Sequence, residues 1–250
     1  MFEPIMTTIG DNLYSVSTRL QQACERAGRA ASEVRLLAVS KTFDADAVRQ
    51  AWQAGQRAFG ENYVQEGVAK IEALRSAGDC PGLEWHCIGP LQSNKTRAVA
   101  EHFDWVHSVD RLKIAERLSA QRPPQLPPLQ VCLQVNVDGG ANKAGVAPDE
   151  LPALARAVAG LPGLRLRGLM CIPEPAPDFE AQRAVFLQAR ALFDDLRARG
   201  MALDTLSMGM SDDLEAAVSA GSTLVRVGRA IFGHRERKPG PADAVTTAAG

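Results

Sequence analysis

The stretch VRLLAVSK, residues 34–41, is followed after three residues by ADAVRQAWQA, residues 45–54. The first stretch is a run of aliphatic residues, which is typical of a buried strand. The second stretch places Ala47, Val48 and Ala51 at the spacing of one face of a helix. A buried strand that leads directly into an amphipathic helix predicts a parallel βα unit.

The same alternation of apolar runs and helical patterns continues along most of the chain, and helical spacing is also found at residues 11–27 and 179–199. The predicted strands are Val34–Lys41, Ala58–Glu61, Leu83–Gly89, Trp105–Val109, Leu129–Val137, Leu164–Ile172, Thr205–Met208 and Leu224–Val227. Eight βα units in 250 residues predict a single-domain (β/α)8 barrel over residues 1–235, with a doubly wound sheet as the alternative. Residues 236–250 are rich in Ala, Pro, Gly and Thr, which predicts a disordered tail.

Composition and charge narrow the class of protein. A net charge of −1 predicts no general attraction to nucleic acid or to an anionic membrane, so any anion site must be local. The five cysteines are scattered and form no C-x-x-C pair, which predicts neither a disulfide framework nor a zinc site. We expect a cytoplasmic protein, because we find no signal peptide and no run of about 18 apolar residues. No long apolar stripe demands a partner, so we expect a monomer.

Lys41 is an unusual residue at the end of a predicted strand. The carboxyl ends of barrel strands face the site, and an ammonium group at the rim of a core is costly unless a ligand uses it. If this side chain is desolvated, its pKa falls and its neutral amine can form a Schiff base with an aldehyde. The alternative is an ordinary surface lysine that follows the strand.

Two glycine-containing turns, Ser207–Ser211 and Gly228–Arg229, follow the seventh and eighth predicted strands. Backbone amides at the start of a helix and serine hydroxyls both bind anions, and barrels often hold phosphate with the loops after these two strands. The turns therefore favour a phosphate site. The alternative is that Ser211 is the N-cap of an ordinary helix with acidic residues in its first turn.

Arg226 lies within the apolar eighth strand and shares a strand face with Gly228. Its guanidinium stays protonated and needs an acceptor, which is either a carboxylate such as Glu61 or a ligand in the barrel mouth. An aldehyde for Lys41, a ring nitrogen for Arg226 and a phosphate for the turns are combined in pyridoxal 5′-phosphate (PLP), the cofactor that we expect. Some other phosphorylated metabolite remains an alternative.

Six segments of the chain also match a known family, in the family's order. They are LAVSKT (37–42), FGENYVQE (59–66), WHCIGPLQSNK (85–95), LRGLM (166–170), LSMGMSDD (206–213) and VRVGRAIFG (225–233). On these segments the chain resembles the pyridoxal phosphate homeostasis protein family. The resemblance implies a single-domain barrel like the N-terminal domain of bacterial alanine racemase.

The resemblance also implies a set of cofactor contacts. Lys41 would hold PLP as a Schiff base, and Arg226 would donate to the pyridine nitrogen. The phosphate would be held by Ser207, Ser211, Gly228 and Arg229, the last two through their backbone amides. The ring pocket would be lined by Asn62, His86 and Met170. Phe43 departs from the family pattern, in which a second lysine is common at this position.

The role that the resemblance implies is carriage of PLP and vitamin B6 homeostasis without a confirmed catalytic activity. Transfer to PLP-dependent apoenzymes, which would be transient partners, stays open. The alternative is a PLP-dependent amino-acid racemase, which needs a second proton-transfer group on the opposite face of the ring. Alanine racemases supply a tyrosine from a second domain, whereas the only tyrosines here are Tyr14 and Tyr63 and no second domain is predicted. We therefore assign no catalytic residue and no metal site.

Overall fold

The centre of the molecule is a closed barrel of eight parallel strands in chain order, with β8 paired to β1. The computed structural model describes residues 8–139 and 144–233. The strands are β1 (Arg35–Val39), β2 (Ala58–Glu61), β3 (Glu84–Cys87), β4 (Trp105–Val109), β5 (Leu129–Gln134), β6 (Leu164–Met170), β7 (Thr205–Ser207) and β8 (Leu224–Val227). The closed ring confirms the predicted (β/α)8 barrel and excludes the doubly wound sheet.

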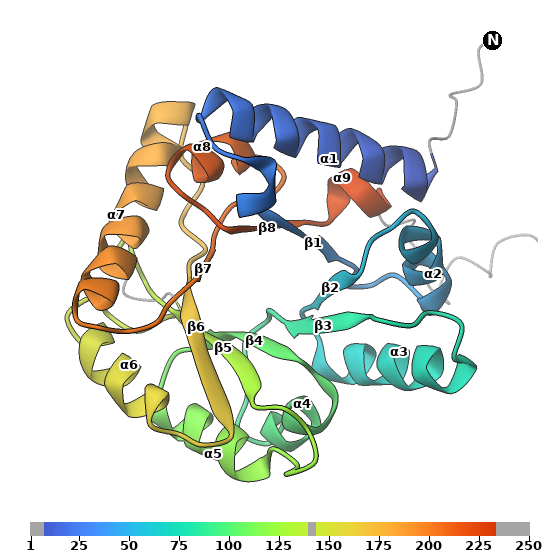
Figure 1. Cartoon of the computed structure of the whole chain (residues 1–250), viewed down its shortest axis with the longest axis horizontal. Coiled ribbons are helices and arrows are strands. Elements are labelled where there is room, and N and C mark those ends of the chain that lie inside the picture. Colours follow the sequence, from blue (N-terminus) through green and yellow to red (C-terminus); the bar gives the residue numbers. More distant parts are fainter. Residues whose placement is uncertain (1–7, 140–143, 234–250) are drawn as a thin grey trace, which may run out of the picture.

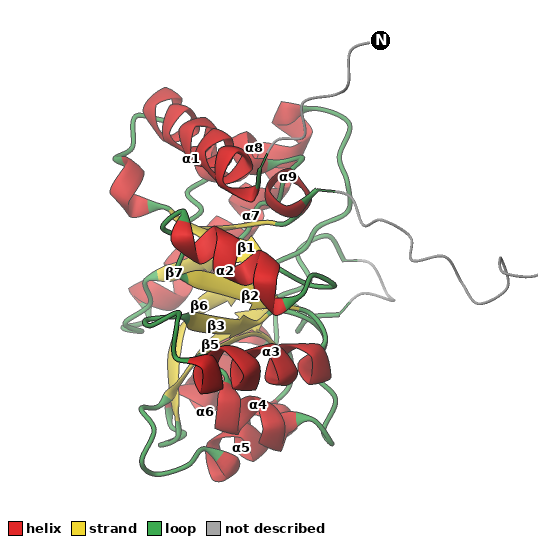
Figure 2. Ribbon diagram, turned by 90° about the vertical axis from the view of Figure 1, so that its right-hand side faces the viewer, coloured by secondary structure: helices red, strands yellow, loops and turns green. Residues whose placement is uncertain are grey.

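Helices surround the strands on the outside of the barrel (Figure 1). They are α1 (Ile9–Arg26), α2 (Ala45–Gln53), α3 (Val64–Ala77), α4 (Thr96–His102), α5 (Leu112–Gln121), α6 (Leu151–Ala159), α7 (Phe179–Ala198), α8 (Leu214–Ser219) and α9 (Arg229–Phe232). After a quarter turn, α1, α8 and α9 lie on one side of the barrel and α4, α5 and α6 on the opposite side (Figure 2). The extra helix α1 packs against α8 and α9, so the chain preceding the first strand braces the last two units.

The strands separate an outer core, beneath the helices, from a smaller inner core. On β2, Phe59 belongs to the outer core, while Ala58 packs inside the barrel with Leu37 and Ile88. This follows from the alternation of side chains along a strand. The same alternation sends Glu61 outward, toward α3, which decides its partner in the site below.

The predicted strands are all present, and several are one to three residues shorter at their ends. At the carboxyl ends, the residues lost from the strands form the first residues of the loops around the barrel mouth. The predicted tail, 236–250, lies outside the described residues, so the division at residue 235 stays a prediction. Within residues 8–139 and 144–233, no helix is long and apolar enough to cross a bilayer.

Candidate functional site

Lys41 lies in a tight turn just after β1, at the mouth of the barrel. The Phe43 amide donates to the Ser40 carbonyl oxygen at 3.1 Å, and Thr42 has φ +68°. Thr42 is the only non-glycine residue with positive φ in the described part of the chain, a region that β-branched residues rarely adopt. Lys41 lies just after the end of a strand, as the sequence indicated, and its side chain is exposed rather than desolvated. Its amine is therefore open to a ligand that arrives from solvent.

A buried ion pair supports this turn from below. Lys70 of α3 donates to Glu61 Oε1 at 2.5 Å and to the Ser40 carbonyl oxygen at 2.8 Å, and the Ser40 hydroxyl donates to Glu61 Oε1 at 2.6 Å. Burial raises the pKa of Glu61, although the Lys70 ammonium opposes this shift. Glu61 Oε2 is buried and has no hydrogen-bond partner in the described residues. Glu61 therefore pairs with Lys70, which removes it as the carboxylate partner that was the alternative to a ligand for Arg226.

Arg226 points into the barrel and is almost fully buried. It donates to Ser207 Oγ at 2.7 Å and to the Cys171 carbonyl oxygen at 2.9 Å. In the described residues it forms no salt bridge, and two of its five N–H groups are used. Burial lowers the pKa of the guanidinium, which nevertheless stays protonated at neutral pH. The barrel thus contains a buried cation whose remaining donors await an acceptor.

Ser207 and His86 lie deeper than the resemblance implies. The Ser207 hydroxyl is fully buried, accepts from Arg226 and lies 2.9 Å from His107 Nδ1. His86 is fully buried as well, with its two ring nitrogens 2.9 Å from His107 Nε2 and 2.7 Å from Glu84 Oε1. Both side chains are thus engaged below Arg226. A phosphate contact by Ser207 and a ring contact by His86 stay predictions.

The loop after β7 passes over the barrel rim. The Gly209 carbonyl oxygen accepts from the Arg226 amide at 2.9 Å, and Gly209 has φ +95°, with no room for a Cβ beside Ala217. The Ser211 carbonyl oxygen accepts from Arg19 at 2.7 Å, so α1 holds this loop in place. Ser211 is half-buried and is not a helix N-cap, because α8 begins at Leu214 after Asp213.

Gly228 and Arg229 form the second turn at the mouth. Gly228 packs against Val39 of β1, where an added Cβ would lie 3.1 Å from the Val39 carbonyl oxygen. In the described residues, neither the Gly228 nor the Arg229 amide donates to a protein acceptor. The Arg229 side chain points away to an exposed pair with Asp212 at 3.0 Å. The two backbone amides are therefore available to an anion, and the phosphate contact itself stays a prediction.

The remaining predicted residues lie on opposite sides of the barrel. Asn62 follows β2 and is half-buried, and its backbone packs so closely on Gly89 that no Cβ would fit there. Met170, at the end of β6, is fully buried against Trp105 and Cys132 in the inner core. The structure thus gathers Lys41, Arg226, Gly228 and Met170 around one barrel end, with the loop residue Ser211 at its rim.

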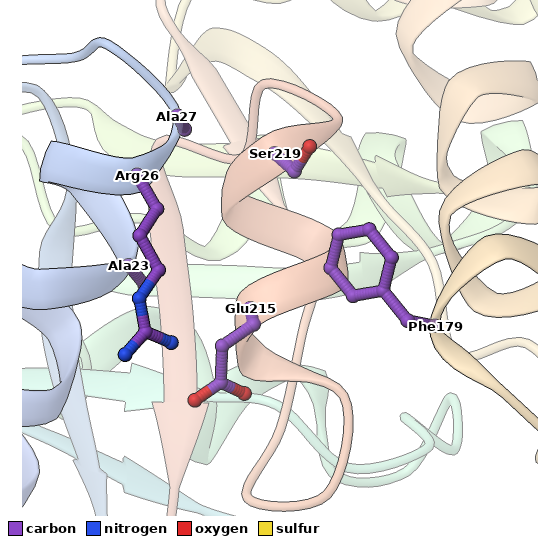
Figure 3. Close-up of a pocket in the computed structure, with 6 residues that line it drawn as sticks. All are labelled: Ala23, Arg26, Ala27, Phe179, Glu215 and Ser219. Atoms are coloured by element: carbon purple, nitrogen blue, oxygen red, sulfur yellow. The ribbon is translucent and has the colours of Figure 1, made fainter.

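A separate pocket of about 210 Å³ lies on the outer wall of the barrel. Its lining includes Arg26 of α1, Phe179 at the start of α7, and Glu215 and Ser219 of α8 (Figure 3). None of the predicted site residues lines it. Glu215 pairs with Arg19, the residue that holds Ser211, at 2.6 Å. The pocket therefore lies beside Arg19, which holds the loop after β7, and is not part of the barrel mouth.

Two buried residues of the site region escaped the sequence analysis. His107 lies within the apolar run Trp105–Val109, and a polar residue inside a buried strand was the signal that had singled out Arg226. Lys70 carries no such signal, because a lysine on a helix is ordinarily exposed and only the fold shows it turned toward β2.

The two buried histidines make stability sensitive to acid. Burial lowers the pKa of His86 and lowers that of His107 well below its ordinary value. Below about pH 6.5 the two histidines become protonated in the unfolded chain more readily than in the folded protein. The free energy of unfolding is therefore retained above that pH and decreases as pH falls. We expect the free energy of unfolding to fall by at most about 1 kcal/mol per histidine between about pH 6.5 and 5.5.

Urea unfolding of the wild type and of His107→Asn across this range measures the effect. The variant is expected to show about half the pH-dependent loss. His102→Asn is the control, since His102 lies on the outside, and it should keep the full loss. Equal slopes for the wild type and His107→Asn would contradict the expectation.

Fold and site together place the protein in the class of alanine racemase-type barrels. The family model described as "Alanine racemase, N-terminal domain" matches residues 13–236. The solved alanine racemase of Corynebacterium glutamicum shares the fold, with a TM-score of 0.62 and 18% identity, over 89% of this chain and 61% of that chain.

Two further comparisons are much closer. The pyridoxal phosphate homeostasis protein of Pseudomonas aeruginosa is 60% identical over 92% of this chain and 97% of its own length. PipY of Synechococcus elongatus, solved with PLP bound, is 40% identical over 90% of this chain and all of that chain, with a TM-score of 0.78. The chain belongs to the pyridoxal phosphate homeostasis protein family.

Proposed function

We propose that this protein binds PLP as a Schiff base on Lys41 and acts in PLP homeostasis without a robust catalytic activity. The observation that carries the proposal is Arg226, a buried guanidinium with free donors and no carboxylate partner in the described residues. A buried cation without an anion is costly unless a ligand supplies the acceptor. The PLP-bound structure of PipY supports the choice of ligand.

The groups around the barrel mouth fit the three parts of PLP. Lys41 offers an exposed amine for the aldehyde, Arg226 offers N–H groups for the ring nitrogen, and the Gly228 and Arg229 amides are free for the phosphate. When bound, PLP supplies a carbonyl that reacts with amines and a ring that withdraws electrons. Ser211 can add a hydroxyl donor at the rim, whereas Ser207 positions Arg226.

Catalysis as a racemase has weaker support. His86 cannot act as a base at the mouth, because it is fully buried and both ring nitrogens are engaged. Tyr14 lies exposed on α1, outside the barrel, while Tyr63 follows β2 and is 56% exposed. The racemase structure is longer, and this chain covers 61% of it. The family's curated relatives carry homeostasis names.

The proposed role includes a cellular compartment, an oligomeric state and partner proteins. We infer that the protein works in the cytoplasm as a monomer and hands PLP transiently to PLP-dependent apoenzymes. An exposed lysine suits such exchange, because an incoming amine can reach the imine from solvent.

Loading followed by reduction tests the proposal. We expect the wild-type protein, incubated with PLP, to gain the visible absorbance of an imine. Borohydride should then fix the adduct on the peptide that contains Lys41, as identified by mass spectrometry. A protein that stays colourless, or an adduct confined to other lysines, would refute the proposal. Incubation with L-alanine in deuterated water tests the alternative, since exchange of the α-proton at an enzymatic rate would indicate a racemase.

A further inference from the structure

A row of polar side chains, buried except for the partly exposed Glu84, crosses the interior of the barrel from the N-terminal end of β3 to Arg226. Glu84 Oε1 lies 2.7 Å from His86 Nε2, and His86 Nδ1 lies 2.9 Å from His107 Nε2. His107 Nδ1 lies 2.9 Å from Ser207 Oγ, which accepts from Arg226 at 2.7 Å. The two histidines and Ser207 are fully buried. Polar groups this deep in a core are costly unless each is satisfied, so the row calls for a physical reason.

The protons in the row can be placed in one way. Arg226 only donates, so Ser207 Oγ accepts from it, and the single hydroxyl proton goes to His107 Nδ1, because the described residues offer this proton no other acceptor. That nitrogen then carries no proton, so His107 Nε2–H donates to His86 Nδ1. His86 Nε2–H in turn donates to Glu84. Every donor of Ser207 and of the two imidazoles meets an acceptor, and both imidazoles are neutral with the proton on Nε2.

The charges at the two ends favour this orientation. Burial works against the ionised form of Glu84, but its hydrogen bond to His86 and the positive charge of Arg35 favour that form and keep its pKa below the usual value. Burial lowers the pKa of both histidines, and the positive charges of Arg226 and Arg35 act in the same direction on His107. Glu84 and Asp104 act in the opposite direction on His86. A carboxylate at one end and a guanidinium at the other thus leave the centre neutral.

We propose that Glu84, His86, His107 and Ser207 are positioning residues that hold Arg226 in one orientation toward the ring nitrogen of the bound cofactor. The proposal rests on the proposed function, because it takes PLP as the ligand that Arg226 meets. Ser207 and the Cys171 carbonyl oxygen hold the NH1 and NH2 groups of the guanidinium. The fork is thereby fixed, and its remaining N–H groups face the ligand. A proton added to His107 would remove the acceptor for the Ser207 hydroxyl and loosen Arg226.

The first test needs no cofactor. Nitrogen-15 NMR of the ligand-free protein is expected to show His86 and His107 as neutral Nε2–H tautomers between about pH 6 and 8. It should also show a scalar coupling across the hydrogen bond from His107 Nε2 to His86 Nδ1. A proton on Nδ1 of either ring, or titration of either ring in this range, would overturn the assignment. His102, on the outside of the barrel, is the internal reference.

The second test compares variants after loading with PLP. In His107→Leu the acceptor for Ser207 is lost, whereas in His107→Asn the amide oxygen can replace Nδ1. We expect roughly tenfold weaker PLP binding for His107→Leu and recovery to within about threefold for His107→Asn. The pH midpoint of the visible absorbance should shift in the leucine variant and return in the asparagine variant. Borohydride should still fix PLP on Lys41 in both.

The outcomes separate the two proposals. If the wild-type protein does not load PLP, the proposed function fails. The NMR result still tests the proton positions assigned to His86 and His107. If the wild type loads PLP and His107→Leu matches it in affinity and pH profile, the positioning role is wrong. Should His107→Leu fail to fold, Ser207→Ala takes its place, because it removes the acceptor of Arg226 directly, and the same weakening is expected.

Discussion

Replacing Lys41 by alanine is expected to abolish the borohydride-stable adduct with PLP and to weaken PLP binding roughly a hundredfold, or by about 2.7 kcal/mol. The reason is that the imine is the only covalent contact proposed, while the donors of Arg226 and the amides of Gly228 and Arg229, which the substitution leaves in place, remain available to the ring and the phosphate. Absorbance spectra, dialysis binding and mass spectrometry of the reduced protein measure both effects.

Lys41→Arg sharpens this experiment. Arginine keeps the positive charge, but it stays protonated and forms no imine, so it should lose the adduct as completely as alanine does. Lys113→Ala is the matched control, because Lys113 is an exposed lysine on α5, a helix that contains none of the predicted site residues. This control should load like the wild type. An undiminished adduct in Lys41→Ala, carried by another lysine, would show that Lys41 is not the attachment point.

Replacing Lys70 by alanine is expected to cost about 3–5 kcal/mol of unfolding free energy near neutral pH. The side chain is 8% exposed and its partner Glu61 is completely buried. Without the ammonium, a buried carboxylate is left with only the Ser40 hydroxyl as a donor. Chemical unfolding at several pH values measures the loss, and Lys113→Ala should change stability by less than about 0.5 kcal/mol.

The pH dependence identifies the cause. Burial raises the pKa of Glu61 in the folded protein, so the destabilising charge is present at neutral pH and disappears as the carboxyl takes up a proton in acid. The loss caused by Lys70→Ala should therefore shrink as pH falls toward about 5. The double variant Lys70→Met with Glu61→Gln should recover much of the stability, because neither charge remains. A loss that is the same at all pH values would indicate a simple cavity.

The ion pair also connects stability to the site. Lys70 holds the Ser40 carbonyl oxygen, and Ser40 begins the turn that contains Lys41 and the positive-φ residue Thr42. A strained backbone persists only where its surroundings hold it. We therefore expect Lys70→Ala, where it remains folded, to react with PLP more slowly than the wild type does.

The sequence by itself determined the barrel. Eight apolar runs, each leading into a helical pattern, predicted every strand, and the barrel closes in their order. The reason is that strand burial in a parallel barrel is a local property: strands covered on both faces must be apolar along their length. Lys41, Arg226 and Gly228 were visible for the same reason, since each interrupts or ends such a run.

Only the tertiary structure decided which polar groups meet. Side chains alternate along β2, so Glu61 and Gly60 face opposite sides of the strand. The sequence does not indicate which of the two faces α3, and it therefore did not reveal Lys70 as the partner of Glu61. Closure of the barrel brings His107 to Ser207, 100 residues later in the chain, and places the Ser207 hydroxyl where it accepts from Arg226. Sequence patterns report most of the buried strand positions, because a strand that is covered on both faces must be apolar along its length. Hydrogen-bond partners depend on distances across the barrel, which are set when β8 pairs with β1.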